Sequence, residues 1–215
     1  MSNALNALTP ERLLIGYCNG IFPMSEARDD PEIFWVEPRM RGVIPLDGFH
    51  ISKSLKKTLN RGTFSVTWDT CFADVVRHCA ARDETWINDT IYDLSCAVFE
   101  QGDGHSVEVW QDNVLVGGVY GFVIGAAFFG ESMFSTATDA SKVALAYLTD
   151  RLRQNGFTLF DTQFITPHLA SMGAIEIPQE EYLVSLRGAI ALGARWDTSE
   201  RQTAQGVIQR NAQIS

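Results

Sequence analysis

A run of sixteen residues without a charged side chain, Val114–Phe129, limits what this chain can fold into. A helix that crosses a membrane needs about 20 consecutive apolar residues. The run is shorter than that, and it contains glycines that weaken a helix. These are Gly117, Gly118, Gly121 and Gly125. We therefore expect two buried β-strands joined by a tight connection, and no segment that spans a membrane.

Helical and strand patterns alternate along the chain after Gly62, and a hairpin is predicted at residues 107–116. This arrangement favours an α/β fold, or more narrowly an α+β mixed sheet. We expect a small N-terminal domain over residues 1–62, a larger domain over 63–195 and a polar, loosely held tail over 196–215. Helices are predicted at residues 10–20, 52–60, 70–82, 89–101 and 139–155, and strands at 33–36, 42–46, 64–68, 107–110, 114–116 and 158–165.

The composition is that of a globular protein. Hydrophobic residues make up 46% of the 215 residues and charged residues 20%, which excludes an intrinsically disordered chain. The four cysteines form no CxxC pair and the four histidines no HxxxH or HExxH motif, so we expect reduced thiols and no metal site. The first residues show no basic region followed by an apolar run, so no signal peptide is predicted.

Two polar side chains, Asp161 and Gln163, interrupt a predicted apolar strand. Residues two apart in a strand face the same side, so this pair should lie together, with Phe160, Thr162 and Phe164 on the other face. Buried polar groups are costly unless they are hydrogen-bonded. The pair either bonds to loops at a strand end or forms a site in which the carboxylate orients the amide toward a reacting group.

A carboxylate, Glu131, follows the uncharged run after a single glycine. At such a position it is at least partly buried and needs a cation or a hydrogen-bond donor. It either reaches water at a strand end or meets a positively charged group of a substrate. The neighbouring Phe128 and Met133 either line an apolar pocket or belong to the ordinary core.

Trp35 and Trp86 are candidate stacking platforms for a ring such as a nucleobase. Trp86 lies in a polar segment, which favours this interpretation. The alternative for each is partial burial in the core.

Residues 39–61 carry six basic side chains against one acidic side chain, in a chain with a net charge of −9. Lys53, Lys56 and Lys57 have the spacing of one helix face. Such a patch on an acidic protein either meets phosphate or is a solvated helix face.

Several short segments, taken together, resemble the leucyl/phenylalanyl-tRNA–protein transferase family. They occur in the family's order and cover roughly residues 9–190. The motif GESMFS at residues 130–135 and the pattern D-x-Q…HLxSxGAxEIP at residues 161–178 are specific when they occur together. The other matching segments are Gly16-Tyr17, Gly20–Met24, Phe34-Trp35 with Pro38 and Arg39, Thr85–Ile87 and Ala140–Lys142.

The resemblance implies an aminoacyltransferase. Members transfer Leu or Phe, and sometimes Met, from aminoacyl-tRNA to the α-amine of a protein that begins with Arg or Lys. The product carries an N-degron for proteolysis. The resemblance also implies a C-terminal domain similar to the GCN5-related acyltransferase fold, no cofactor, no membrane partner and a cytoplasmic location, and we expect a monomer.

The resemblance assigns roles to particular residues. Gln163 would contact the attacking amine through its side-chain carbonyl, while Asp161 would orient Gln163 and balance the developing charge. Glu131 would hold the site and face the basic N-terminal residue. Trp35 and Trp86 would stack on the terminal adenosine. The pocket for the transferred side chain would comprise Phe128, Met133, Leu145, Leu148 and Leu152, and the tRNA backbone would contact Arg39, Arg41, Lys53, Lys56, Lys57 and Arg61.

Two other functions remain open. An acyl-CoA N-acyltransferase would need a Q/R-x-x-G-x-G/A loop before a helix to bind pyrophosphate, and residues 134–142 lack it. A non-catalytic reader of basic protein N-termini would use Glu131 and Asp161 as an acidic pocket. One departure from the family is Gln179, where many relatives are expected to carry a basic residue.

Overall fold

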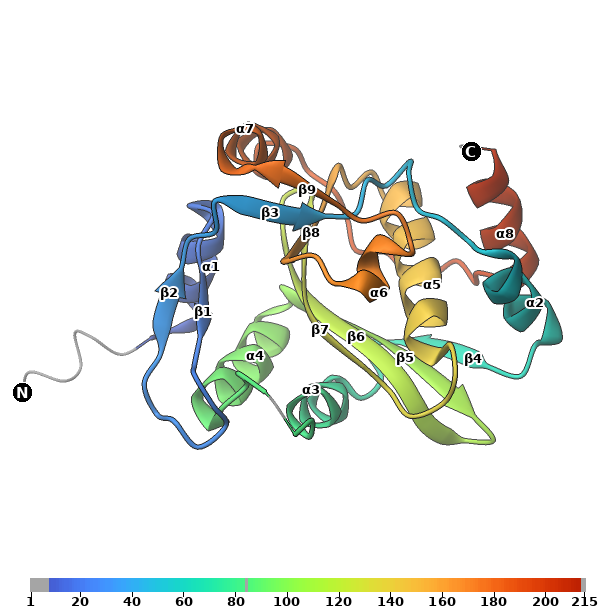
Figure 1. Cartoon of the computed structure of the whole chain (residues 1–215), viewed down its shortest axis with the longest axis horizontal. Helices are drawn as coiled ribbons and strands as arrows, with labels where there is room; N and C mark the ends of the chain where they lie inside the picture. Colours follow the sequence, from blue (N-terminus) through green and yellow to red (C-terminus); the bar gives the residue numbers. More distant parts are fainter. Residues whose placement is uncertain (1–7, 84, 214–215) are drawn as a thin grey trace, which may run out of the picture.

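A computed structural model describes residues 8–83 and 85–213 (Figure 1). The signal-peptide prediction falls largely on residues 1–7, outside the described residues. In chain order the elements are α1 (Pro10–Cys18), β1 (Phe22–Met24), β2 (Phe34–Val36), β3 (Met40–Val43), α2 (Lys53–Arg61), β4 (Ser65–Trp68), α3 (Phe72–Ala80), α4 (Asp89–Gln101), β5 (Gly104–Gln111), β6 (Val114–Ile124), β7 (Ala127–Ser135), α5 (Ala140–Gln154), β8 (Leu159–Gln163), α6 (Pro167–Ala170), β9 (Ile175–Pro178), α7 (Gln179–Ile190) and α8 (Ala204–Ala212).

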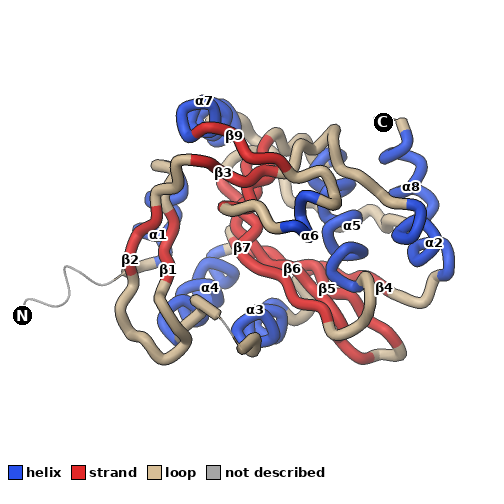
Figure 2. The backbone as a smooth tube through the Cα atoms, in the orientation of Figure 1, coloured by secondary structure: helices blue, strands red, loops and turns tan. Residues whose placement is uncertain are grey.

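Seven strands form one mixed sheet in the order β4-β5-β6-β7-β8-β3-β9, and β1 and β2 form a separate two-stranded sheet (Figure 2). The β7–β8 pair is parallel, and every other pair in the large sheet is antiparallel. The predicted mixed α/β class is therefore confirmed.

The uncharged run forms β6 and the first part of β7, Ala127–Phe129, as predicted, with Gly125 at a φ of 60° in the connection. Gly121 is required where these strands pair, because a Cβ there would lie 2.2 Å from the backbone oxygen of Phe129. No helix within the described residues is both long enough and apolar enough to cross a membrane.

Local signals set several boundaries correctly. The Ser52 side chain accepts a hydrogen bond from the Leu55 amide and begins α2, and Gly62, at a φ of 65°, ends it. Asp112 and Asn113 both have positive φ values in the two-residue β5–β6 turn. A type I′ turn needs positive φ at both central positions, which explains the predicted hairpin.

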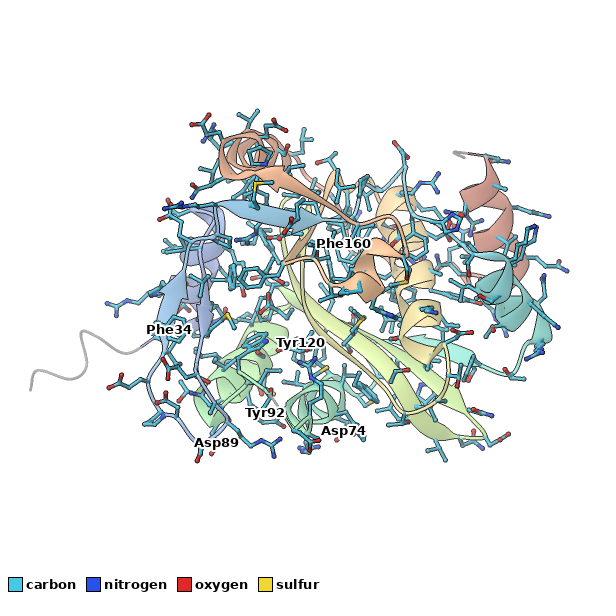
Figure 3. All side chains as sticks on the ribbon, viewed as in Figure 1. Phe34, Asp74, Asp89, Tyr92, Tyr120 and Phe160 are labelled. Carbon is cyan, nitrogen blue, oxygen red and sulfur yellow. The ribbon has the colours of Figure 1, made fainter. Side chains whose placement is uncertain are left out.

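Helices cover both faces of the large sheet. α5 packs on β5, β6 and β7 from one side, with α2 and α8 outside it, whereas α3 and α4 pack on the other side (Figures 1 and 2). Each face has its own apolar core, and Figure 3 labels one member of each, Phe160 on the α5 side and Tyr120 on the α3 side.

Strand β3 comes early in the chain but lies between β8 and β9. Met40–Val43 pairs with Ile175–Pro178 on one side, and Gly42 and Val43 pair with β8 on the other. Strand pairing thus crosses the boundary expected near residue 62, which stays a prediction.

The prediction of a loosely held C-terminal tail is wrong. The Trp196 indole donates to Asp69 Oδ2 at 2.8 Å, and the Arg210 guanidinium is bound to Asp150 at 2.7 Å. Val207 of α8 is 1% exposed. The segment is polar in composition but is held by specific side-chain contacts.

Candidate active site

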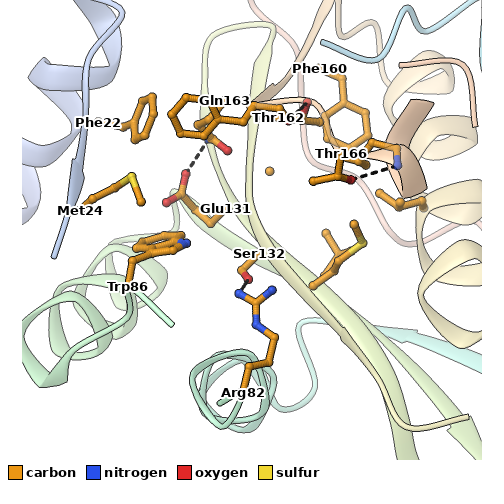
Figure 4. A pocket seen from close by; sticks show the side chains of 16 residues that line it. Phe22, Met24, Arg82, Trp86, Glu131, Ser132, Phe160, Thr162, Gln163 and Thr166 are labelled. Atoms are coloured by element: carbon orange, nitrogen blue, oxygen red, sulfur yellow. Dashed lines mark hydrogen bonds between the residues drawn. The ribbon is translucent and has the colours of Figure 1, made fainter. Parts of the chain in front are cut away.

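A cavity of about 180 Å³ opens between the end of β8, the middle of β7 and the small β1–β2 sheet (Figure 4). Its apolar part suits a hydrocarbon side chain, and its polar groups come from β7, from β8 and from the segments after α3 and β8. The lining residues are Phe22, Met24, Arg82, Trp86, Val119, Gly130, Glu131, Ser132, Met133, Leu145, Phe160, Thr162, Gln163, Phe164, Thr166 and Leu169.

Glu131 and Gln163 meet in this cavity. The Gln163 Nε2 donates to Glu131 Oε1 at 3.0 Å, shown as a dashed line in Figure 4. Among the described residues, none donates to the side-chain carbonyl of Gln163. The amide is therefore oriented through its nitrogen, with its oxygen left to accept a hydrogen bond from a ligand.

The backbone at Gln163 departs from a regular strand. Its φ is 56°, and the Phe164 amide donates to the Thr162 carbonyl at 2.6 Å, closing a three-residue turn. Thr162, Gln163 and Phe164 consequently all line the cavity, although consecutive strand residues alternate between faces. The predicted side-by-side arrangement of Gln163 and Asp161 is corrected on this point.

Gly42 makes room for this turn. A Cβ at Gly42 would lie 2.6 Å from the carbonyl carbon of Phe164. The β3–β8 pairing is irregular at the same place, between Gly42 and Val43. The close approach of β3 therefore supports a non-glycine residue at positive φ, which is a strained conformation often found at functional sites.

Asp161 lies behind the cavity and is fully buried. Its carboxylate accepts four hydrogen bonds: from Arg41 Nε at 2.9 Å, from Arg41 Nη2 at 2.6 Å, from the Tyr182 hydroxyl at 2.7 Å and from the Gln163 backbone amide at 2.8 Å. The carboxylate is thus tied directly to the strained residue at the cavity wall.

Arg41 is 1% exposed and neutralises Asp161. Its guanidinium lies 4.6 Å from the Phe22 ring centroid and 4.5 Å from that of Tyr182, and Nη1 donates to the Gly20 carbonyl at 3.0 Å. The prediction that Arg41 contacts the tRNA backbone is wrong, because this side chain is enclosed and its charge is already paired.

Sequence reasoning missed Tyr182 altogether, because no helix was assigned to residues 179–190. Tyr182, Leu186 and Ala189 are the buried residues of α7. Their i, i+4, i+7 spacing is a helical signal that could have found this element.

Burial, helped by the nearby Asp161 charge, raises the pKa of Glu131 to about 8. The Tyr17 hydroxyl and Arg41 act in the opposite direction. A carboxyl group with such a pKa is largely protonated at neutral pH and can exchange its proton there.

The two candidate stacking tryptophans do not come together. Trp86 lines the cavity, with Met24 close to it in Figure 4. Trp35 instead lies over Gly16 of α1, so close that a Cβ there would be 2.2 Å from its ring, and it is not among the lining residues. The prediction that Trp35 shares a binding site with Trp86 is therefore corrected.

Only part of the predicted apolar pocket lines the cavity. Met133 and Leu145 do so. Phe128, Leu148 and Leu152 are almost wholly buried in the core on the α5 side. Phe128 supports the wall indirectly, since its ring packs edge-on against Phe160 at 5.4 Å.

The remaining basic residues are exposed but separate into two places. On α2 lie Lys53, Lys56, Lys57 and Arg61. Arg39 precedes β3 near the small sheet, at the opposite end of the molecule (Figure 1).

Gln179, at the start of α7, donates from its side chain to Glu37 Oε1 at 2.7 Å. No group of His, Cys, Asp and Glu side chains that could hold a metal ion occurs among residues 8–83 and 85–213.

Comparison with known proteins identifies the class. Residues 43–187 match the family described as leucyl/phenylalanyl-tRNA protein transferase, and residues 6–39 match the N-terminal domain of that family. The leucyl/phenylalanyl-tRNA–protein transferase of Ruegeria pomeroyi is 57% identical over 209 residues, covering 97% of this chain and 100% of the relative. That of Cereibacter sphaeroides is 57% identical over 210 residues, covering 97% and 98%.

Solved structures are more distant. FemX matches with a TM-score of 0.48 and 13% identity, covering 80% of this chain and 70% of that chain. The sequence matches settle the class: this protein is a transferase. More specifically, the chain belongs to the leucyl/phenylalanyl-tRNA protein transferase family.

Proposed function

We propose that this protein transfers Leu or Phe, and in some cases Met, from aminoacyl-tRNA to the α-amine of proteins that begin with Arg or Lys. The observation that carries the proposal is the Gln163–Glu131 pair at the wall of an otherwise largely apolar cavity. The matches to named transferases support it. We place the activity in the cytoplasm, with an N-degron as the product and a monomer as the active form.

The reaction needs alignment more than a nucleophile on the enzyme, because the aminoacyl ester is already activated. The amine nitrogen attacks the ester carbonyl carbon, the C–N bond forms, and the C–O bond to the ribose breaks. The amine loses one proton, and the departing ribose oxygen gains one and becomes a free hydroxyl of the tRNA. The Gln163 side-chain carbonyl oxygen accepts a hydrogen bond from the attacking amine. Glu131 holds the Gln163 amide and faces the basic side chain of the acceptor's N-terminal residue.

Asp161 acts as a positioning residue in this proposal. It binds the Gln163 backbone amide at 2.8 Å, and so holds the turn that aims the side chain. Its charge is already balanced by Arg41 at 2.6 Å, so we assign it no role in balancing charge that develops on the amine.

Substrate recognition follows from the lining. Met133 and Leu145 would contact the transferred side chain, and Trp86 would stack on the terminal adenosine. An apolar pocket separates large from small side chains but distinguishes similar ones by only about 1–3 kcal/mol per methylene. Acceptance of both Leu and Phe is therefore expected. The exposed lysines of α2 would contact the tRNA backbone.

The test mixes the purified chain with radiolabelled Leu-tRNA or Phe-tRNA and matched peptides that begin with Arg, Lys or Ala. Label is expected in the Arg and Lys peptides and not in the Ala peptide. Binding of Arg peptides without product, while the aminoacyl-tRNA stays intact, would instead support a reader of basic N-termini. Acetyl-CoA with the same peptides tests the acyl-CoA alternative.

A further inference from the structure

A second hollow adjoins the cavity and has a volume of about 740 Å³. The two hollows share Arg82 and Met133 in their linings, so they are neighbours along the surface. We refer to the second as the β7–α5 groove. Its lining residues are His78, Ala81, Arg82, Met133, Phe134, Ser135, Thr136, Ala137, Thr138, Asp139, Ser141, Lys142 and His168.

The far side of the β7–α5 groove reaches helix α2. Asp139, in the groove wall, accepts a hydrogen bond from Thr58 of α2 through Oδ2 at 2.9 Å. α2 carries the exposed basic residues at positions 53, 56 and 57. The groove therefore forms a path from the cavity with Gln163 to the basic helix.

The β7–α5 groove contains two cationic side chains. Arg82 is exposed at the junction with the cavity, where Nη2 donates to the Ser132 hydroxyl at 2.9 Å. No salt bridge found among the described residues involves it. The Lys142 Nζ lies 3.1 Å from Asp139 Oδ1, so the Asp139 carboxylate offsets part of the positive charge of Lys142. A guanidinium with free N–H groups matches the oxygens of a phosphate.

An aromatic surface lies beside these cations. The exposed His78 ring stacks on Phe134 at 4.6 Å with an interplanar angle of 14°. An exposed flat ring accepts a nucleobase of any sequence by stacking. Phosphate-binding side chains next to a stacking ring are what a single-stranded nucleic acid needs.

We propose that the β7–α5 groove binds the phosphodiester-linked nucleotides that precede the terminal adenosine of the donor RNA. Arg82 and Lys142 contact the phosphate, and His78 offers its ring to a base. This inference rests on the proposed function, because it continues an aminoacyl-adenosine out of the cavity. The groove would lead the single strand from the cavity toward α2, which the residues that line the cavity do not reach.

The experiment compares two dinucleotides that differ only in charge. Cytidylyl-(3′→5′)-adenosine carries one phosphodiester, and its methylphosphonate analogue is neutral with the same bases. Equilibrium affinities are measured by calorimetry on the full chain. We expect the charged dinucleotide to bind about tenfold more tightly, and its log affinity to fall with log salt at a slope of about −0.7 for the single phosphate.

The variants Arg82→Gln and Lys142→Gln should each reduce the charged-to-neutral affinity ratio by about three- to tenfold, since exposed charge pairs are partly screened. Arg77→Gln is the matched control. Arg77 lies on α3, the helix that ends shortly before Arg82, but its guanidinium is engaged by Asp74 and the Tyr92 hydroxyl. The control should leave the ratio unchanged.

A ratio near one in the unmodified chain would overturn the proposal, as would a ratio that neither groove variant alters. Failure of the proposed function looks different, because Leu and Phe transfer to Arg peptides would then be missing while the affinity ratio stays high. Failure of the groove proposal alone would leave transfer intact. If one variant does not fold, the other and the salt slope still decide.

Discussion

The buried ion pair behind the cavity makes the strongest prediction about stability. Arg41→Met removes two of the four hydrogen bonds that the Asp161 carboxylate accepts and leaves its charge buried without a counterion. Removing one partner of a buried pair costs about 3–5 kcal/mol. A folded domain has only about 5–15 kcal/mol of unfolding free energy, so the variant should be close to the limit of folding.

A second change separates the charge from the packing. Asp161→Asn, made together with Arg41→Met, removes the uncompensated charge, and the remaining amide can still accept from Gln163. We expect the double variant to cost about 2 kcal/mol less than the sum of the single variants. The measurement is urea unfolding followed by circular dichroism. Arg39→Met, on an exposed side chain two positions away, should cost less than about 0.5 kcal/mol.

Two results would refute this reasoning. One is a decrease in unfolding free energy below about 1 kcal/mol for Arg41→Met, which would mean that water or a rearranged side chain reaches the carboxylate. The other is strict additivity in the double variant, which would mean that the two groups stabilise the fold independently.

Glu131 should titrate near pH 8 in a carbon-detected NMR experiment, and the signal should be absent from Glu131→Gln. The folded chain keeps this proton up to about pH 8, whereas the unfolded chain loses it near 4.5. The unfolding free energy should therefore decrease as the pH is raised from about 4.5 to about 8. A titration near 4.5 would contradict the burial argument. Gln163→Gly keeps the positive φ and should lower kcat for transfer by about 100- to 1000-fold without a decrease in unfolding free energy; a normal rate would exclude a contact with the amine. Changing Lys53, Lys56 and Lys57 together to Gln should weaken Leu-tRNA binding and flatten its salt dependence by about 0.7–0.9 for every phosphate that these lysines neutralise; an unchanged slope would exclude α2 from the interface.

Sequence patterns predicted the elements whose signals are local. The Ser52 cap, the Asp112-Asn113 turn and the uncharged run are each complete within a few residues, and each marks an element found in the structure. The family motifs that contain Glu131 and Gln163 predicted that both residues belong to one site, and the structure shows the hydrogen bond between them.

Long-range contacts could not be predicted in the same way. Arg41 belongs to a basic run that normally indicates solvent exposure, and its partner Asp161 lies 120 residues away in the chain. The left-handed conformation of Gln163 depends on the approach of Gly42 from another strand. Trp196 is held by Asp69 across a separation of 127 residues. In each case the pattern around the residue is the same whether or not the distant partner exists.

The insertion of β3 between β8 and β9 has a consequence for how the protein is made. Chains emerge from the ribosome amino end first, and N-terminal parts usually fold first. Arg41 is synthesised early, but its partners come from β8 and from Tyr182 in α7, the last of which appears 141 residues later. The cluster of Arg41, Asp161 and Tyr182 therefore cannot form until α7 has been translated. A product truncated before α7 would contain Glu131 and Gln163 but lack the hydroxyl that helps to hold Asp161, so the Asp161 carboxylate receives all four of its hydrogen bonds only after α7 has been made.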